Sequence, residues 1–207
     1  FYPSRWLVGR PAFPHYAMYR ELMLDSLNAE ALTRLRKGPD IRIAISRPPA
    51  SMGPKTAAVA GIVAYLIDKR IYGGVHPRLP AKLGFRPEIL SARDCDTPES
   101  LADLVLASSC TPPFTPIVRV CGQTALDGGL YDNVPAYAVS KKDDPCLVLL
   151  TRRYKESAIP KIPGRLYLQP SQPLPISKWD YTSPDKMQET FDIGRKDGER
   201  FALLHRR

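Results

Sequence analysis

The sequence predicts an α/β layered domain, in which helices pack against a sheet. Strand-like segments alternate with helical segments along the chain, which favours this class. A continuous apolar run over 146–150 is typical of a strand that is buried on both faces. The 207 residues are 43% hydrophobic and 25% charged, close to an ordinary globular protein. This composition excludes a wholly disordered chain, a collagen-like chain and a coiled coil.

The N-terminal half is expected to contain a helix, a strand and a second helix. The first helical pattern runs from 17 to 37 and is stopped by Gly38-Pro39, and the alternating isoleucines of 41–45 predict a strand. Residues 55–70 are apolar nearly all round and predict a helix buried in a core, with a re-entrant or membrane-touching segment as the alternative. Its apolar run of 11 residues is too short for a membrane span, which needs about 20. Residues 71–90 are rich in Gly and Pro and predict a loop.

Two later helices are marked by a hydroxyl residue followed by proline. Thr97-Pro98 begins a helix that runs to about residue 107, and Ser183-Pro184 begins the last one. Gly194 and Gly198 lie on the inner stripe of the last helix, where each costs about 1 kcal/mol in helix propensity. They predict a close approach of that helix to a sheet. Strands are expected over 117–120, 146–150 and 165–168.

The net charge of +9 is unevenly distributed. Residues 1–47 carry 8 basic and 4 acidic groups, residues 48–140 carry 8 of each, and residues 141–207 carry 14 and 9. The simplest interpretation is a solvated basic surface, and the alternative is contact with an anionic membrane or a nucleic acid. Nothing in the sequence resembles an aromatic-basic recognition motif, so no nucleic-acid partner is expected.

The cysteines, histidines and acidic residues form no metal-binding or redox motif in the sequence. No two cysteines have the C-x-x-C spacing of a zinc or redox site. A protein of this size does not need disulfides to hold its core, which favours free thiols and a reducing compartment. Asp94 and Asp96 lack the glycine and glutamate of a metal loop, so no metal and no cofactor is expected. The histidines are far apart and show no constellation. The residues concerned are Cys95, Cys110, Cys121 and Cys146, and His15, His76 and His205.

The sharpest local signal is the stretch from Leu126 to Pro135, which contains Asp127-Gly128-Gly129. One interpretation is a tight hairpin turn after the strand 117–120, with Asp127 accepting backbone hydrogen bonds. The other is a carboxylate held at a strand end as a general base for a serine or a water, beside glycines that permit close approach. Ser108, Ser109 and Cys110 upstream are expected to pack before the Pro112-Pro113 turn, not to act as nucleophiles.

The ordered run from Leu101 to Pro135 resembles the patatin-like phospholipase family. It has a helix, a Ser/Thr stretch, a proline-rich turn, a strand, Asp-Gly-Gly and then Asn133-Val134-Pro135. The similarity is clearest over 97–139, extends over 165–200 and is faint before residue 90. It implies a three-layer α/β/α hydrolase of lipid acyl esters, one domain over 1–207, with a Ser-Asp dyad that uses no histidine. By this resemblance Asp127 is the base, and Gly128 and Gly129 shape its turn.

The sequence departs from the family pattern in one respect. None of its 13 glycines is followed two residues later by serine, so neither G-x-S-x-G nor a glycine-rich oxyanion loop is present. The family places both before the matched region. We therefore expect the C-terminal portion of a longer lipid hydrolase, incomplete at its N-terminus and inactive alone. The alternative is a non-catalytic domain of the same fold that binds lipid or a partner. For either function we expect a location in the cytoplasm or at the periphery of a membrane, where an anionic membrane surface is a candidate contact.

Overall fold

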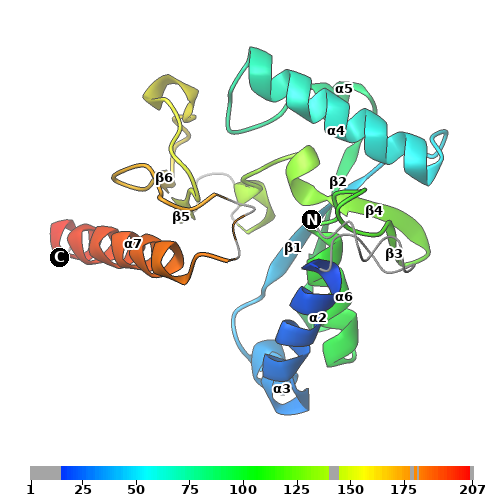
Figure 1. Ribbon diagram of the computed structural model, residues 1–207, viewed down its shortest axis with the longest axis horizontal. Coiled ribbons are helices and arrows are strands. Elements are labelled where there is room, and N and C mark those ends of the chain that lie inside the picture. Colours follow the sequence, from blue (N-terminus) through cyan, green and yellow to red (C-terminus); the bar gives the residue numbers. More distant parts are fainter. Residues whose placement is uncertain (1–14, 140–144, 178–179, 181, 206–207) are drawn as a thin grey trace. The chain divides into compact units, whose positions relative to one another are not determined.

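The computed structural model describes residues 15–139, 145–177, 180 and 182–205 (Figure 1). The chain divides into two compact units, Phe1–Val139 and Ser140–Arg207, and each is described by itself. The described residues combine helices and sheets, as the predicted α/β class requires. The assignment of residues 1–207 to one domain stays a prediction.

The first unit contains most of the regular structure. Its helices are α2 His15–Ser26, α3 Ala29–Lys37, α4 Pro54–Ile71, α5 Leu79–Lys82 and α6 Pro98–Ala107. Its strands are β1 Arg42–Arg47, β2 Arg86–Ser91, β3 Val118–Val120 and β4 Gln123–Asp127. Short 3-10 turns are η1 Ala92–Asp94, η2 Gly128–Leu130 and η3 Ala136–Ala138.

The sheet of the first unit has the strand order β2-β1-β4-β3 with antiparallel neighbours. Helix α5 and most of strand β2 fall in the segment 71–90 that was predicted as a loop, and that prediction is wrong for residues 79–82 and 86–90. The sequence of β2, with Arg86, Pro87 and Glu88, has no strand periodicity, and full-length pairing with β1 supplies the missing stabilisation. The hairpin turn between β3 and β4 lies at Cys121 and Gly122, both with positive φ. The Asp-Gly-Gly stretch is therefore not the hairpin turn.

Two hydrophobic clusters lie on opposite faces of this sheet because successive side chains of a strand alternate. Ile43, Ile45 and Ala125 pack with residues of α3 and α6. Leu126 packs with Phe85 and with residues of α4. Figure 1 shows α4 on one side of the sheet and α2, α3 and α6 on the other.

The single helix predicted over 17–37 is two helices in the structure. Asn28 separates α2 from α3 in an extended conformation, and its side chain accepts a hydrogen bond from Ala31 N at 2.8 Å. Asn is among the best N-cap residues, so this local bond starts a new helix where the apolar pattern alone would continue the old one.

Helix α4 was predicted to be buried all round, and this is wrong. The face toward the sheet is buried and made of small residues, including Ala57, Ala58, Gly61 and Ala64. The opposite face exposes large apolar side chains. A sheet covers only one side of a helix. The small residues let α4 come close to it, as at Gly61, where an added Cβ would lie 3.0 Å from Phe85 Cζ.

The second unit consists of β5 Cys146–Leu149, η4 Glu156–Ala158, β6 Arg165–Leu168 and α7 Pro184–Leu204. Strands β5 and β6 pair in parallel. The expected burial of β5 on both faces is wrong. Val148 is buried, but Leu149 is 68% exposed, because the described part of this unit covers only one face of the pair.

The last helix begins at Pro184, directly after Ser183, as predicted, but the Ser183 side chain makes no capping hydrogen bond. The predicted close approach at Gly194 and Gly198 is not observed. Among the described residues, no atom outside the helix's own backbone lies within 4 Å of a Cβ added at either glycine. No helix in the described ranges combines the length and the apolar character that a membrane crossing requires.

The start of α6 gives a stability test. Thr97 Oγ1 accepts a hydrogen bond from Ser100 N, and Ser100 Oγ accepts one from Thr97 N, both at 3.1 Å. We expect Thr97→Ala to lower the free energy of unfolding by about 1 kcal/mol, because the first turn loses its acceptor. Urea unfolding followed by circular dichroism measures the change. Thr97→Ser keeps the acceptor and should stay near the wild type, so equal losses in both variants would contradict the capping role.

Candidate functional site

Strand β4 carries Asp127 at its C-terminal end, next to the middle of the sheet. Antiparallel pairing places Asp127 opposite Ile45 of β1, and Leu126 opposite Ser46. Asp127 N donates to Cys110 O at 2.9 Å, which joins the strand end to the segment after α6. The backbone of Asp127 is therefore fixed from two sides.

The Asp127 side chain is half-buried, and both of its carboxylate oxygens are oriented by hydrogen bonds. Oδ1 accepts from Gly129 N at 2.8 Å, so Asp127 caps the short turn η2. Oδ2 accepts from the Thr111 hydroxyl at 3.2 Å. The prediction that Asp127 accepts backbone hydrogen bonds is confirmed, although the turn it caps follows β4.

The two glycines after Asp127 are required for different reasons. A Cβ at Gly128 would lie 2.3 Å from the carbonyl oxygen of Ala44, so no side chain fits between η2 and β1. A Cβ at Gly129 would lie 3.1 Å from Asp127 Oδ1 and 3.2 Å from Asn133 Oδ1, which is a milder conflict with side-chain atoms. Gly128 thus sets the distance between the turn and the sheet.

The segment after α6 supports this turn. Gly128 N donates to Ser108 O at 3.1 Å, and the Ser108 hydroxyl donates to Ala44 O at 2.7 Å. Cys110 is fully buried, and burial raises the pKa of its thiol, which disfavours the nucleophilic thiolate. The expected packing role is confirmed for Ser108 and Cys110, whereas Ser109 is exposed.

Ser46 of β1 is part of the site, and the sequence analysis missed it. The side chain is fully buried beneath the turn, where its Oγ accepts from Tyr131 N at 3.2 Å and lies 3.4 Å from Gly128 O. A buried serine in a strand is recognisable only once the register with β4 is known. Its hydroxyl holds the backbone of the turn.

A second group of polar residues follows the turn and was also missed. His76 Nδ1 lies 2.7 Å from Asp132 Oδ1, which also accepts from Val134 N at 2.8 Å. Asn133 Nδ2 donates to Val75 O at 3.2 Å, and the Tyr65 hydroxyl lies 3.3 Å from Asn133 Oδ1. These bonds tie the segment after Asp127 to α4 and to the connection that follows it. His76 and Asp132 are 56 residues apart, so no local sequence motif could indicate this pair.

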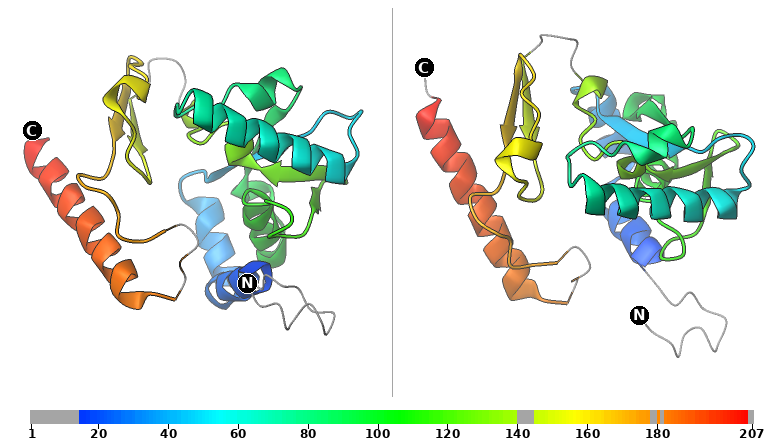
Figure 2. Two further views of the ribbon diagram at one scale, coloured as in Figure 1. Left: turned by 45° about the horizontal axis from the view of Figure 1, so that its top comes forward. Right: turned by 90° about the horizontal axis from the view of Figure 1, so that it is seen from above.

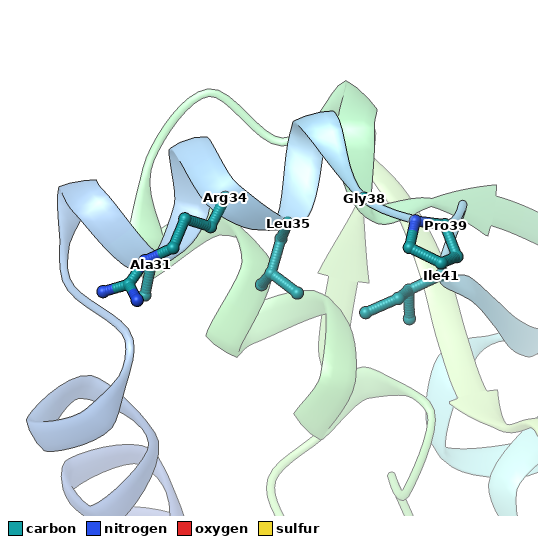
Figure 3. Close-up of a pocket in the computed structure, with 6 residues that line it drawn as sticks. All are labelled: Ala31, Arg34, Leu35, Gly38, Pro39 and Ile41. Atoms are coloured by element: carbon teal, nitrogen blue, oxygen red, sulfur yellow. The ribbon is translucent and has the colours of Figure 1, made fainter.

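Two cavities of the first unit lie away from this turn. One of about 480 Å³ is formed by α3 and the start of the following segment, with Arg34, Leu35, Pro39 and Ile41 among its lining residues (Figure 3). The other, of about 560 Å³, lies between α6 and β3 and is lined by residues such as Asp94 and Thr97. Neither cavity is lined by Asp127 or by the glycines of its turn.

Comparison with protein families places the chain in a family. The model of the patatin-like phospholipase family matches residues 1–140, about two-thirds of the chain, and the chain therefore belongs to that family. The match includes Asp127 and the region before residue 90, where the sequence resemblance is faint. The resemblance over 165–200 lies outside it and stays a prediction. Searches of curated proteins and of solved structures gave no match.

The contact at Gly128 predicts a large loss of stability on substitution. We expect Gly128→Ala to lower the free energy of unfolding by about 3 kcal/mol or more, because the new methyl would overlap the Ala44 carbonyl oxygen. Thermal unfolding measures it. The control is Gly194→Ala in α7, where an added Cβ meets no atom within 4 Å and should stabilise the helix by roughly 0.5–1 kcal/mol. A Gly128→Ala protein that melts like the wild type would contradict the close contact.

Tyr137, in η3, gives a pH test. Burial raises its pKa to about 12, and the negative charge of Asp132 acts in the same direction. An unfolded tyrosine ionises near pH 10. The folded state therefore holds a proton that the unfolded state releases, and stability falls as pH rises from about 10 toward 12. Tyr137→Phe should lose less stability over this range. The melting temperatures of the wild type and of Tyr137→Phe, measured between about pH 10 and pH 12, test this prediction. If both melting temperatures fall by the same amount over this range, the prediction is contradicted.

Proposed function

We propose that this chain carries the catalytic base of a lipid acyl hydrolase that uses a Ser-Asp dyad, and that the base is Asp127. The observation that carries the proposal is the position of its carboxylate, which is held at the end of β4 within the stretch that the family model matches. Membership of the patatin-like phospholipase family supports lipids as the substrate class. The proposed architecture is the three-layer α/β/α domain, supported by clusters on both faces of the sheet.

The geometry suits a general base. In the proposed reaction, Asp127 removes the proton from a serine hydroxyl while the serine oxygen attacks the ester carbonyl. Protonated Asp127 then gives this proton to the leaving alcohol oxygen as the ester C–O bond breaks. In the second step Asp127 takes a proton from a water whose oxygen attacks the acyl carbonyl, and the proton returns to the serine oxygen as the fatty acid leaves. Gly129 N and the Thr111 hydroxyl hold the two oxygens of Asp127 in place, so little reorganisation is needed when the proton moves. Support from Ser46 and Ser108 beneath the turn keeps this geometry fixed.

The serine of the dyad is not identified among these 207 residues. The serines that touch the turn already have structural bonds, since Ser46 is fully buried and Ser108 donates to Ala44 O. The proposal therefore takes the nucleophile and the oxyanion donors from outside this stretch of sequence. A non-catalytic domain that binds lipid is the second candidate, favoured by the missing G-x-S-x-G motif and by the basic flanks.

The role of Asp127 is tested by Asp127→Asn in the gene product that contains this sequence. The amide keeps an oxygen acceptor for Gly129 N but cannot take a proton, so folding should persist while ester hydrolysis falls by about a hundredfold or more. A chromogenic short-chain ester and a phospholipid serve as substrates.

The matched control is Asp25→Asn on the exposed surface of α2, which should leave hydrolysis unchanged. Retained turnover in a folded Asp127→Asn protein would exclude Asp127 as the base. If the wild-type gene product hydrolyses neither ester, the second candidate function replaces the first.

A further inference from the structure

The large apolar side chains of α4 lie on the face that points away from the sheet. A helix whose only role is to cover a sheet would have them on the face toward it. The buried residues of α4 are three alanines, a glycine and an aspartate, whereas its outer face carries large apolar residues, with Val59 64% exposed and Leu66 57% exposed. We name this set the α4 outer stripe. Its members are Val59, Val63, Leu66, Ile67 and Ile71.

The spacing of the α4 outer stripe places its members on one side of the helix. Steps of three and four residues repeat along one face, so the five side chains form a continuous band. Each member of the stripe is between 45% and 64% exposed. Figures 1 and 2 show α4 at the edge of the first unit, with α5 beside it. Burial of a Val, Leu or Ile side chain is worth about 1.5–3 kcal/mol, so this band gains much from a surface that covers it.

The charges on α4 indicate what kind of surface would cover the α4 outer stripe. The exposed charged residues of the helix are Lys55, Lys69 and Arg70, all of them basic. Its acidic residue, Asp68, is 2% exposed, and its Oδ2 accepts from Arg78 N and Leu79 N at 2.7 Å. The helix therefore presents apolar side chains together with positive charge at both ends.

The residues that follow α4 extend this pattern. The Tyr72 ring is 49% exposed, and the Arg78 guanidinium carbon lies 5.4 Å from its centroid. Tyrosine, lysine and arginine are the residues that sit at the boundary between hydrocarbon and headgroups, since each has an apolar body and a polar tip. A basic, apolar helix face of this kind lies in the plane of an anionic bilayer surface.

We propose that α4 docks on an anionic phospholipid bilayer, with the α4 outer stripe in the interface and its basic residues against the headgroups. The proposal rests on the proposed function for the choice of lipid as partner. A second copy of the chain fits less well, because a symmetric contact between two α4 helices would place the basic ends of each against those of the other.

Docking in this way places the candidate site close to its substrate. The inner side of α4 packs on the turn, since a Cβ at Gly61 would lie 3.4 Å from Leu130 Cδ1, and Tyr65 reaches Asn133. One helix, about 10 Å thick, then separates the turn from the bilayer surface. A lipid ester would therefore have to move by about the thickness of this helix to reach Asp127.

The experiment measures co-sedimentation of the 207-residue chain with vesicles. One set contains phosphatidylglycerol and phosphatidylcholine in equal parts, and the other contains phosphatidylcholine alone. We expect binding to the anionic vesicles that weakens with salt, and weaker binding to the neutral ones. The double variant Val63→Ser, Leu66→Ser should bind the anionic vesicles at least about tenfold more weakly than the wild type. The matched control is Leu203→Ser, Leu204→Ser on α7, also at exposed positions, which should bind like the wild type.

A second variant reports insertion directly. In Val63→Trp the tryptophan fluorescence should shift to the blue when anionic vesicles are added, because the new indole leaves water. The wild-type chain, with its two native tryptophans, is the reference. Absence of wild-type binding, equal losses in the α4 and α7 variants, or no fluorescence shift would each overturn the proposal. It would also be overturned if sedimentation shows a dimer that Val63→Ser, Leu66→Ser converts to a monomer without any vesicle binding.

The two proposals fail in different ways. Asp127→Asn should bind vesicles like the wild type, because Asp127 is not on the α4 outer stripe. An Asp127→Asn protein that remains active would end the catalytic proposal and leave vesicle binding untouched. If the wild-type chain does not bind vesicles, the docking proposal is excluded, but the role of Asp127 can still be tested with a soluble ester.

Discussion

The contact between Gly128 and the Ala44 carbonyl is the constraint on which the rest of the site depends. Only a residue without a Cβ lets the turn η2 come this close to β1. That approach brings Gly128 N to Ser108 O and Tyr131 N to Ser46 Oγ, and it lets Asp127 cap the turn that it precedes. The position of one carboxylate thus follows from a missing methyl group on the next residue.

The segment after the turn, which contains Asp132 and Asn133, is also fixed by hydrogen bonds. Asp132 and Asn133 use their side chains to bind His76, Tyr65 and the Val75 carbonyl, all of which belong to α4 or the connection after it. Most buried polar groups in proteins are hydrogen-bonded, and here their bonds join the sheet to α4. A base needs a fixed geometry to act efficiently, and this network gives the turn little freedom to move.

Helix α4 packs against the candidate site on one face and carries the α4 outer stripe on the other. Its small residues allow it to pack closely against Phe85 and Leu130, which leaves its large apolar residues on the outside. The same packing that supports the candidate site thereby creates the face that we assign to lipid. The exposed α4 outer stripe shows that a face of the first unit is available for docking, and the proposed function, supported by family membership, is the ground for choosing lipid as its partner.

The sequence by itself determined the features that arise from local interactions. The start of α6 at Thr97-Pro98, the start of α7 at Pro184, the strand 165–168 and the motif around Asp127 could be predicted, because capping, proline geometry and alternation act within a few residues. Only the tertiary structure decided which apolar residues are covered. It buried one face of α4, exposed Leu149, paired β2 with β1 and brought His76 to Asp132, because these outcomes depend on partners tens of residues away in the chain.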